Sequence, residues 1–205
     1  SMFSGTPDEI EAARQAEMQR WAHYEQNALA VAINATRLQI LQEQTPEIRD
    51  LLELTSHNPF IPPGREIIFA RGYLAGLQGD YLKSLSLLVP QVENSLRYLL
   101  NRQGVLTSSL SSEGIQEEFD LNVLLEMPEV KDIFGEDLLF DLKCNLTSRF
   151  GSNFRNLMAH GLLDYQDFYS YTAVYIWWLL LRICCLPLII AQHQEESKDD
   201  TTPIE

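Results

Sequence analysis

The sequence predicts an all-α fold, a helical bundle with a long N-terminal helical arm. Residues 8–44 contain no Gly or Pro and are rich in Ala, Leu, Gln, Glu and Arg, which is the composition of a single long helix. Apolar residues recur at helical spacing through residues 81–103. No stretch alternates apolar and polar residues over the length that a β-strand would need.

Composition and charge limit the possible functions. With 205 residues, of which 45% are apolar and 21% charged, the chain can form one soluble domain with a substantial core. Its net charge of −14 argues against a protein that binds nucleic acid through many phosphates, so we expect no DNA-specific binding and only local RNA contact. Cys144, Cys184 and Cys185 have neither disulfide nor zinc spacing, so we expect a reduced, cytoplasmic protein without a cofactor.

Residues 1–57 form the predicted N-terminal arm. In its long helix, apolar and small residues recur at steps of three and four, as in a short heptad seam: Trp21, Tyr24, Ala28, Val31, Ala35 and Leu38. The seam has two interpretations, because the helix could pack across the bundle or contact a second copy of the chain. A short helix from Thr45-Pro46-Glu47 follows, and the Pro- and Gly-rich residues 55–64 mark the boundary with the main body, residues 58–192.

The first two helices of the main body are predicted at residues 65–78 and 81–103. Gly72 and Gly76 lie four residues apart, so they would let another helix approach the first one closely. Asp80 would cap the second helix.

Glu93 and Arg97 lie one turn apart at the margin of the apolar face of residues 81–103. As an i, i+4 pair they would form a surface salt bridge. Alternatively, Glu93 turns inward and orients Arg155, because a buried guanidinium requires an acceptor.

The remaining predicted elements are a mobile loop at residues 105–117, short helices at 121–127 and 128–134, a longer helix at 136–149, and a last helix capped by Asp164. The last helix is apolar from residue 173 to 191, which is long enough to cross a membrane. Arg182 in its middle, Pro187 and the lack of a basic flank argue against a span. We expect a buried central or dimer-interface helix, followed by a disordered acidic tail at residues 193–205.

The candidate chemistry lies in residues 149–162, where an arginine, an asparagine and a histidine fall within six positions. One face of this segment is a core-facing stripe of Phe154, Leu157, Met158, Gly161 and Leu162. The other face carries Arg155, Asn156 and His160, with only the small Ala159 between Arg155 and His160. A groove with a guanidinium on one wall and an imidazole on the other could hold a phosphate.

The charge around this motif differs from that of the whole chain. No Asp or Glu occurs between Asp141 and Asp164, so Lys143, Arg149 and Arg155 form a locally positive segment. We expect Lys143 and Arg149, together with Asn153, to help bind an RNA phosphate.

Helix-ending residues lie on both sides of the motif. Gly151 should break the preceding helix, and Ser152 or Asn153 should cap the next one. Gly161 should end it in a left-handed conformation. The motif helix is therefore predicted to be short.

The segment Arg155-Asn156-Leu157-Met158-Ala159-His160 contains an Arg, a polar residue directly after it, and a His beyond four intervening positions. Together with the upstream segments 62–66 and 90–97, it resembles the HEPN superfamily. The match is to a HEPN-type domain of unknown function that also occurs in the endoplasmic-reticulum membrane-associated RNA degradation protein. The resemblance covers about residues 58–190 and implies a HEPN-like helical bundle.

The resemblance further implies a metal-independent endoribonuclease that acts as a homodimer, with the two motifs facing each other across a composite groove. His160 would take the proton from a ribose 2′-hydroxyl or deliver one to the leaving oxygen. Arg155 would hold the phosphate and the charge that develops on it. Asn156 would orient His160 or the phosphate, while Glu93 and Arg97 would orient the site. The products would be a 2′,3′-cyclic phosphate and a 5′-hydroxyl.

Two other functions stay open on the sequence alone. Members of the superfamily also serve as non-catalytic modules, so the chain could bind a protein or sense RNA without cutting it. The apolar last helix also allows a membrane-associated scaffold. A toxin or defence role with an antitoxin-like protein partner is compatible with the resemblance.

Overall fold

The structure is a computed structural model that describes residues 6–111 and 114–199, with the backbone alone beyond Ile190. It is mostly helical, which confirms the predicted all-α fold. The elements are α1 (Pro7–Glu43), α2 (Ile48–Thr55), α3 (Glu66–Leu77), α4 (Tyr81–Arg102), β1 (Ser108–Leu110), β2 (Gln116–Glu118), α5 (Leu121–Glu126), α6 (Pro128–Leu146), α7 (Phe154–Ala159), a 3-10 turn (Asp167–Tyr169) and α8 (Tyr171–Asp199).

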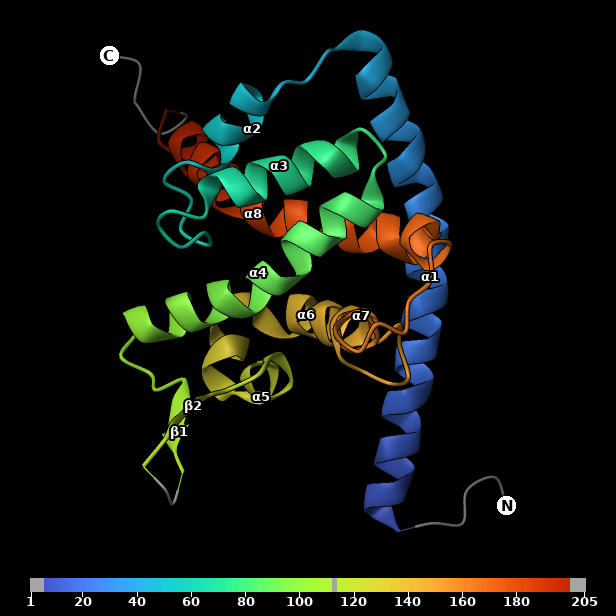
Figure 1. Cartoon of the computed structure of the whole chain (residues 1–205), viewed down its shortest axis with the longest axis vertical. Helices are drawn as coiled ribbons and strands as arrows, with labels where there is room; N and C mark the ends of the chain where they lie inside the picture. Colours follow the sequence, from blue (N-terminus) through green and yellow to red (C-terminus); the bar gives the residue numbers. More distant parts are fainter. Residues whose placement is uncertain (1–5, 112–113, 200–205) are drawn as a thin grey trace.

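Helix α1 runs along one edge of the molecule, with the bundle on one side of it (Figure 1). It starts with a capping box in which the side chains of Thr6 and Glu9 each bond the other's backbone amide. Its buried face meets α6 and α8, and the Arg37 guanidinium donates to the Leu77 carbonyl at 2.8 Å. Packing of this helix on the bundle is therefore confirmed. The predicted seam is not the packed face, because Trp21 and Tyr24 are 63% and 70% exposed.

Helices α3, α4 and α8 cross at the centre of the core. Gly72 and Gly76 permit both crossings on α3: a Cβ at Gly72 would lie 2.6 Å from Leu88 of α4, and one at Gly76 would lie 2.2 Å from Trp177 of α8. The predicted role of the two glycines is confirmed. Ala30 and Leu51 of the predicted arm belong to the same hydrophobic core, so the packing continues across the boundary predicted near residue 58.

Helix α8 packs in the centre of the bundle, where about half of its apolar stretch is buried. Residues 171–190 are the one described stretch long and apolar enough to cross a membrane, on length and composition alone, with a mean hydropathy of 2.2. Half of that stretch is buried, against α1, α2, α3 and α4. Arg182 lies over the Trp178 ring, 5.5 Å from its centroid, so its charge stays at the surface of the bundle.

Two elements differ from the sequence prediction in the loop after α4. Residues 108–110 and 116–118 form a small antiparallel hairpin, in which Ser108 pairs with Glu118, where only a mobile loop was expected. Strands of three residues are too short to show an alternating pattern. The hairpin is tied to α4, because Glu118 forms an ion pair with Arg97 at 3.5 Å.

The last helix also begins and ends differently. Asp164 does not cap it; its carboxylate accepts from the backbone amides of Gln166 and Asp167 in a turn, and α8 starts after Ser170. At the other end, α8 continues to Asp199, into the predicted disordered tail, because Gln, Glu and Lys favour continuation of a helix. Residues 200–205 of that tail lie outside the described residues.

Candidate active site

The motif helix α7 is held between two backbone features. At Gly151 the chain passes so close to α6 that a Cβ would lie 1.9 Å from the Cys144 carbonyl oxygen. Asn153 then adopts a left-handed conformation with φ 50° at the start of α7, although its side chain makes no capping bond. Gly161, with φ 67°, ends the helix as predicted. The turns at both ends fix where the polar face of α7 points.

The apolar face of α7 packs only in part as predicted. Phe154 is buried and meets Phe168 edge to face, with ring centroids 5.6 Å apart. Leu162 was predicted to face the core but is 67% exposed. The reason is that the chain reverses at Gly161, so Leu162 no longer follows the helical spacing of the stripe.

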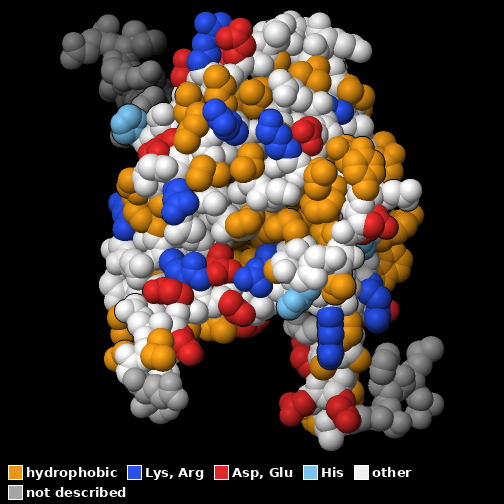
Figure 2. Space-filling view, viewed as in Figure 1, with side chains coloured by type: hydrophobic (Ala, Val, Ile, Leu, Met, Phe, Trp, Pro, Cys, Tyr) orange, Lys and Arg blue, Asp and Glu red, His pale blue; other side chains and the backbone are white. Residues whose placement is uncertain are grey.

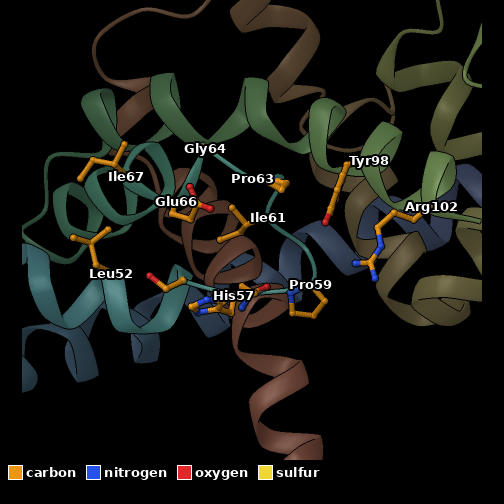
Figure 3. Close-up of a pocket in the computed structure, with 12 residues that line it drawn as sticks. Leu52, His57, Pro59, Ile61, Pro63, Gly64, Glu66, Ile67, Tyr98 and Arg102 are labelled. Carbon is orange, nitrogen blue, oxygen red and sulfur yellow. The ribbon is translucent and has the colours of Figure 1, made fainter.

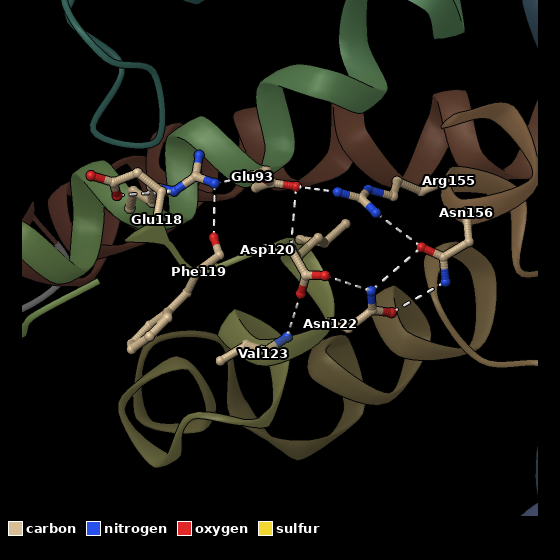
Figure 4. Close-up of polar contacts among 10 residues, drawn as sticks. Glu93, Glu118, Phe119, Asp120, Asn122, Val123, Arg155 and Asn156 are labelled. Carbon is tan, nitrogen blue, oxygen red and sulfur yellow. Dashed lines mark hydrogen bonds and ion pairs between the residues drawn. The ribbon is translucent and has the colours of Figure 1, made fainter. Parts of the chain in front are cut away.

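The polar face of α7 is joined to α4 by one ion pair (Figure 4). The Arg155 Nη2 donates to Glu93 Oε2 at 2.6 Å, and both side chains are about one-fifth exposed. The other oxygen of Glu93 bonds Arg97, and Glu93 Oε2 also accepts from the Leu121 amide at 3.1 Å. Of the two interpretations of Glu93, the inward orientation of Arg155 is therefore observed, and the pair with Arg97 is present as well.

Asn156 connects the same arginine to α5 and to the loop before α7. Its Oδ1 accepts from Arg155 Nη1 at 3.0 Å, while its Nδ2 donates to Asn122 Oδ1 at 3.2 Å and to Asn153 Oδ1 at 2.8 Å. Asn122 in turn donates to Asp120 (Figure 4). The Arg155 guanidinium is thus held in place by Glu93 on one side and by Asn156 on the other.

Asp120 caps α5 beneath this network. Its Oδ1 accepts from the Val123 amide at 3.0 Å. This bond holds the pKa of the Asp120 carboxyl below its usual value, and the Asn122 amide and the charge of Arg155 lower it further. The carboxylate therefore stays charged and keeps α5 aligned with the site.

His160 lies outside the bonded network. It is the residue after α7, its backbone amide donates to the Asn156 carbonyl at 3.1 Å, and its side chain is exposed. Its imidazole makes no hydrogen bond or ion pair with any side chain that the structure describes. Both ring nitrogens are therefore open to solvent or to a ligand.

Lys143 and Arg149, which were predicted to help bind an RNA phosphate, do not join the cluster. Lys143 bonds Glu126 at 2.8 Å, and Arg149 lies over the Phe150 ring at 5.0 Å. The positive segment predicted from the sequence is therefore largely neutralised, because Glu126 and Glu93 arrive from other parts of the fold.

The charge of the central cluster is not positive either. Two guanidinium groups, of Arg97 and Arg155, face the carboxylates of Glu93, Glu118 and Asp120. A phosphate would have to be recognised through individual N–H groups and not through a general positive potential.

The lower outline of the molecule is notched (Figure 2). Figure 2 shows a notch between the β1–β2 hairpin and the N-terminal half of α1, and a row of basic, acidic and histidine side chains above it. In Figure 1, α5 and α7 lie above the same notch. On the polar face of α7, His160 is exposed, whereas Arg155 and Asn156 are half-buried.

A separate pocket of about 860 Å³ lies near the end of α4 (Figure 3). His57 and Pro59 of the loop before α3 form one wall, and Tyr98 and Arg102 form another. It contains none of the predicted site residues, and nothing in its lining identifies a ligand.

Sequence reasoning missed the contribution of α5. Asn122 and Asp120 complete the network around Arg155, and the Phe119 carbonyl accepts from Arg97 at 2.8 Å. Asp120 directly before an apolar helical segment is a recognisable cap signal. Asn122 carries no signal in the sequence, because its contact with Asn156 depends on how α5 docks.

Residues 6–111 and 114–190 contain no group of three or more His, Cys, Asp or Glu side chains that could hold a metal ion. No protein family, curated protein or solved structure compared with this chain matches it. Function therefore has to be argued from the chemistry of the site itself.

Proposed function

We propose that this protein is a metal-independent endoribonuclease of HEPN type, with Arg155 and His160 acting on a phosphodiester of single-stranded RNA. The observation that carries the proposal is the state of these two side chains. The Arg155 guanidinium is fixed by Glu93 and Asn156, while the His160 imidazole, five residues on, is exposed and unbonded.

Arg155 keeps donors available for a phosphate. A guanidinium has five N–H groups, and the bonds to Glu93 and Asn156 use one on each terminal nitrogen. Its side chain is 22% exposed, so part of the planar fork reaches solvent. A fixed guanidinium stabilises charge on phosphate oxygens without reorganising during the reaction.

His160 would act as the general base or the general acid. In the proposed step the ribose 2′-oxygen attacks phosphorus as the 2′-hydroxyl proton passes to a base. The bond from phosphorus to the 5′-oxygen breaks, and that oxygen takes a proton. The products are a 2′,3′-cyclic phosphate and a 5′-hydroxyl. An imidazole suits either proton transfer, and the motif of a second copy would supply the other one at a composite site.

The proposal is tested by incubating the purified protein with single-stranded RNA in EDTA. We expect the wild type to cleave the RNA, and the cleavage rate to fall at least about 100-fold in both Arg155→Ala and His160→Ala. Matched controls change the same residue types elsewhere: Arg71→Ala on the exposed face of α3, and His57→Asn, since Asn tolerates the φ of 60° at that position. Both controls should cleave like the wild type.

Cleavage that survives either site substitution would contradict these roles. RNA that binds the wild type but stays intact would favour the second function considered from the sequence, a non-catalytic RNA-sensing module. In that case the same substitutions should weaken RNA binding.

A further inference from the structure

Helix α1 has a buried face and, nearly opposite to it, an exposed apolar stripe. The buried face is directed at the bundle and combines the apolar Ala30, Ile33 and Leu41 with the polar Gln26 and Arg37. The exposed stripe is the heptad seam of Trp21, Tyr24, Ala28, Val31, Ala35 and Leu38, every member of which is exposed. At 100° per residue the centres of the buried face and the seam are about 150° apart. A helix that packs on one side needs an apolar stripe only on that side, so the intrachain packing leaves the seam unexplained.

An open hollow on α1 includes the first two residues of the seam. It measures about 450 Å³ and is lined by Glu17, Arg20, Trp21 and Tyr24, which are spaced i, i+3, i+4 and i+7. Four residues at this spacing form the hole that receives one knob from a facing helix. The spacing of these four residues is therefore compatible with a facing helix.

We propose that α1 pairs with α1 of a second copy of this chain, in antiparallel orientation, with the two-fold axis between Ala28 and Val31. In this register Ala28 lies opposite Val31 of the second copy, Tyr24 opposite Ala35, and Trp21 opposite Leu38. Large side chains meet small ones in the middle of the seam. Leu38 of the second copy lies over the hole beside Trp21.

Charge selects the antiparallel orientation. A parallel, in-register pair would place Arg14 on its own copy and Glu17 on its own copy, because both continue the heptad positions of the seam. The antiparallel register places Glu17 opposite the neutral Gln42, and Arg14 just beyond the end of the second helix, which ends at Glu43. Arg20 and Glu25, at the edges of the seam, meet the neutral Gln39 and Asn34. No like charges face each other.

The available area fits a reversible dimer. Exposure of 63% at Trp21 and 70% at Tyr24 leaves roughly 200–350 Å² of aromatic surface on each chain. Val31 and Leu38, about half exposed, add to it over a seam about 26 Å long. This is a large part of the roughly 800 Å² per partner in a standard interface. Because the seam points away from the bundle, the two bundles lie on the outer sides of the pair.

This pairing is independent of the proposed RNA cleavage and differs from the composite groove. The loop before α7 bonds Gln19, since Ser148 donates to its side chain, and Gln19 is about ten residues from the two-fold axis. The two loops would therefore be about 30 Å apart along the helix pair. If the chain also formed the composite groove, each copy would have two partners. The assembly would then contain more than two copies.

The first test measures mass by light scattering during gel filtration of the whole chain. Val31→Glu places a charge in the seam, so we expect a wild-type dimer to become a monomer, and a larger wild-type assembly to lose mass. Thr36→Glu, on an exposed flank between the buried face and the seam, should keep the wild-type mass. Circular dichroism checks that both variants stay helical. A wild-type monomer, or a Val31→Glu variant that keeps the full mass, would overturn the proposal.

A second test examines the register. Ala35→Tyr would set two tyrosines against each other, so we expect the dissociation constant of the pair to rise about tenfold. Adding Tyr24→Ala restores one tyrosine opposite one alanine and should bring the constant back close to that of the wild type. Failure of the double variant to recover would overturn the antiparallel register.

Discussion

Glu93 and Arg155, 62 residues apart in the chain, form a 2.6 Å ion pair that joins α4 to α7. Glu93 also bonds Arg97 and the backbone amide of Leu121 at the start of α5. One carboxylate therefore connects three helices and the predicted catalytic arginine. Removal of this carboxylate would take one acceptor from each of two guanidinium groups and from one backbone amide.

We predict that Glu93→Ala lowers the free energy of unfolding by about 2–3 kcal/mol, because partly buried donors lose their partner. Glu93→Gln keeps an acceptor oxygen and should lose less. Glu53→Ala, on the exposed face of α2, should stay within about 0.5 kcal/mol of the wild type. Urea unfolding measures all three. Equal stability of Glu93→Ala and Glu53→Ala would show that the ion pair adds nothing to the fold.

Asn156 is predicted to act on cleavage by positioning Arg155. Asn156→Ala removes the oxygen that accepts from Arg155 Nη1 at 3.0 Å, so we expect the rate of RNA cleavage to fall about 10- to 100-fold. Asn122→Ala removes a more distant contact and should have a smaller effect. Single-turnover cleavage rates separate the two. If both variants lose the same activity, the effect comes from α5 docking and not from Arg155.

Asp141 is predicted to make stability depend on pH. Burial raises the pKa of its carboxyl above the usual value, against the opposing effect of bonds from Tyr175 and Gln26. The folded chain thus holds this proton to higher pH than the unfolded chain, whose Asp titrates at about 3.9. The stability that the Asp141 proton contributes is fully present below the pKa of the unfolded chain. It is lost as pH rises through the raised pKa of the folded chain.

Asp141→Asn removes this titration and can still bond Tyr175 and Gln26. We therefore expect the variant to be at least as stable as the wild type at pH 7, with a smaller change in unfolding free energy between pH 4 and 7. Asp141→Ala loses both bonds and should be less stable by about 1–3 kcal/mol. Denaturant unfolding across this pH range measures the difference. A loss of stability in Asp141→Asn at pH 7 would contradict this account of the buried carboxyl.

Gly151 and Gly161 are predicted to differ in their tolerance of a side chain. Gly151→Ala forces a Cβ to 1.9 Å from the Cys144 carbonyl, so the loop before α7 must move and we expect a loss of more than about 2 kcal/mol. Gly161→Ala meets open space and carries only the strain of φ 67°, about 1 kcal/mol. Thermal unfolding compares them. The reverse order would show that the approach to Cys144 is not tight.

Much of the fold could be predicted because local signals agreed with it. The absence of Gly and Pro predicted α1, Asp80 and its bond to the Lys83 amide define the start of α4, and Gly161 ends α7. Gly135, with φ 74°, kinks α6 between the two helices predicted there. Asp164 misled the prediction, because an aspartate stabilises a turn by the same bonds with which it caps a helix.

The candidate site was predictable only in part. The link from Glu93 to Arg155 was one of two interpretations of Glu93, based on the need of a guanidinium for an acceptor. Lys143 could not be placed, because its pairing with Glu126 is fixed by how α5 and α6 pack. Contacts between distant segments, such as Asn122 with Asn156, leave no trace in spacing or composition.

The most direct test of the proposed function identifies the ends of the cleaved RNA. Mass spectrometry of products formed in EDTA should show a 2′,3′-cyclic phosphate and a 5′-hydroxyl, absent in His160→Ala. The same oligonucleotide with 2′-O-methyl groups should resist, because it lacks the attacking hydroxyl. Cleavage of the methylated RNA, or products with a 5′-phosphate, would contradict 2′-hydroxyl attack at Arg155 and His160.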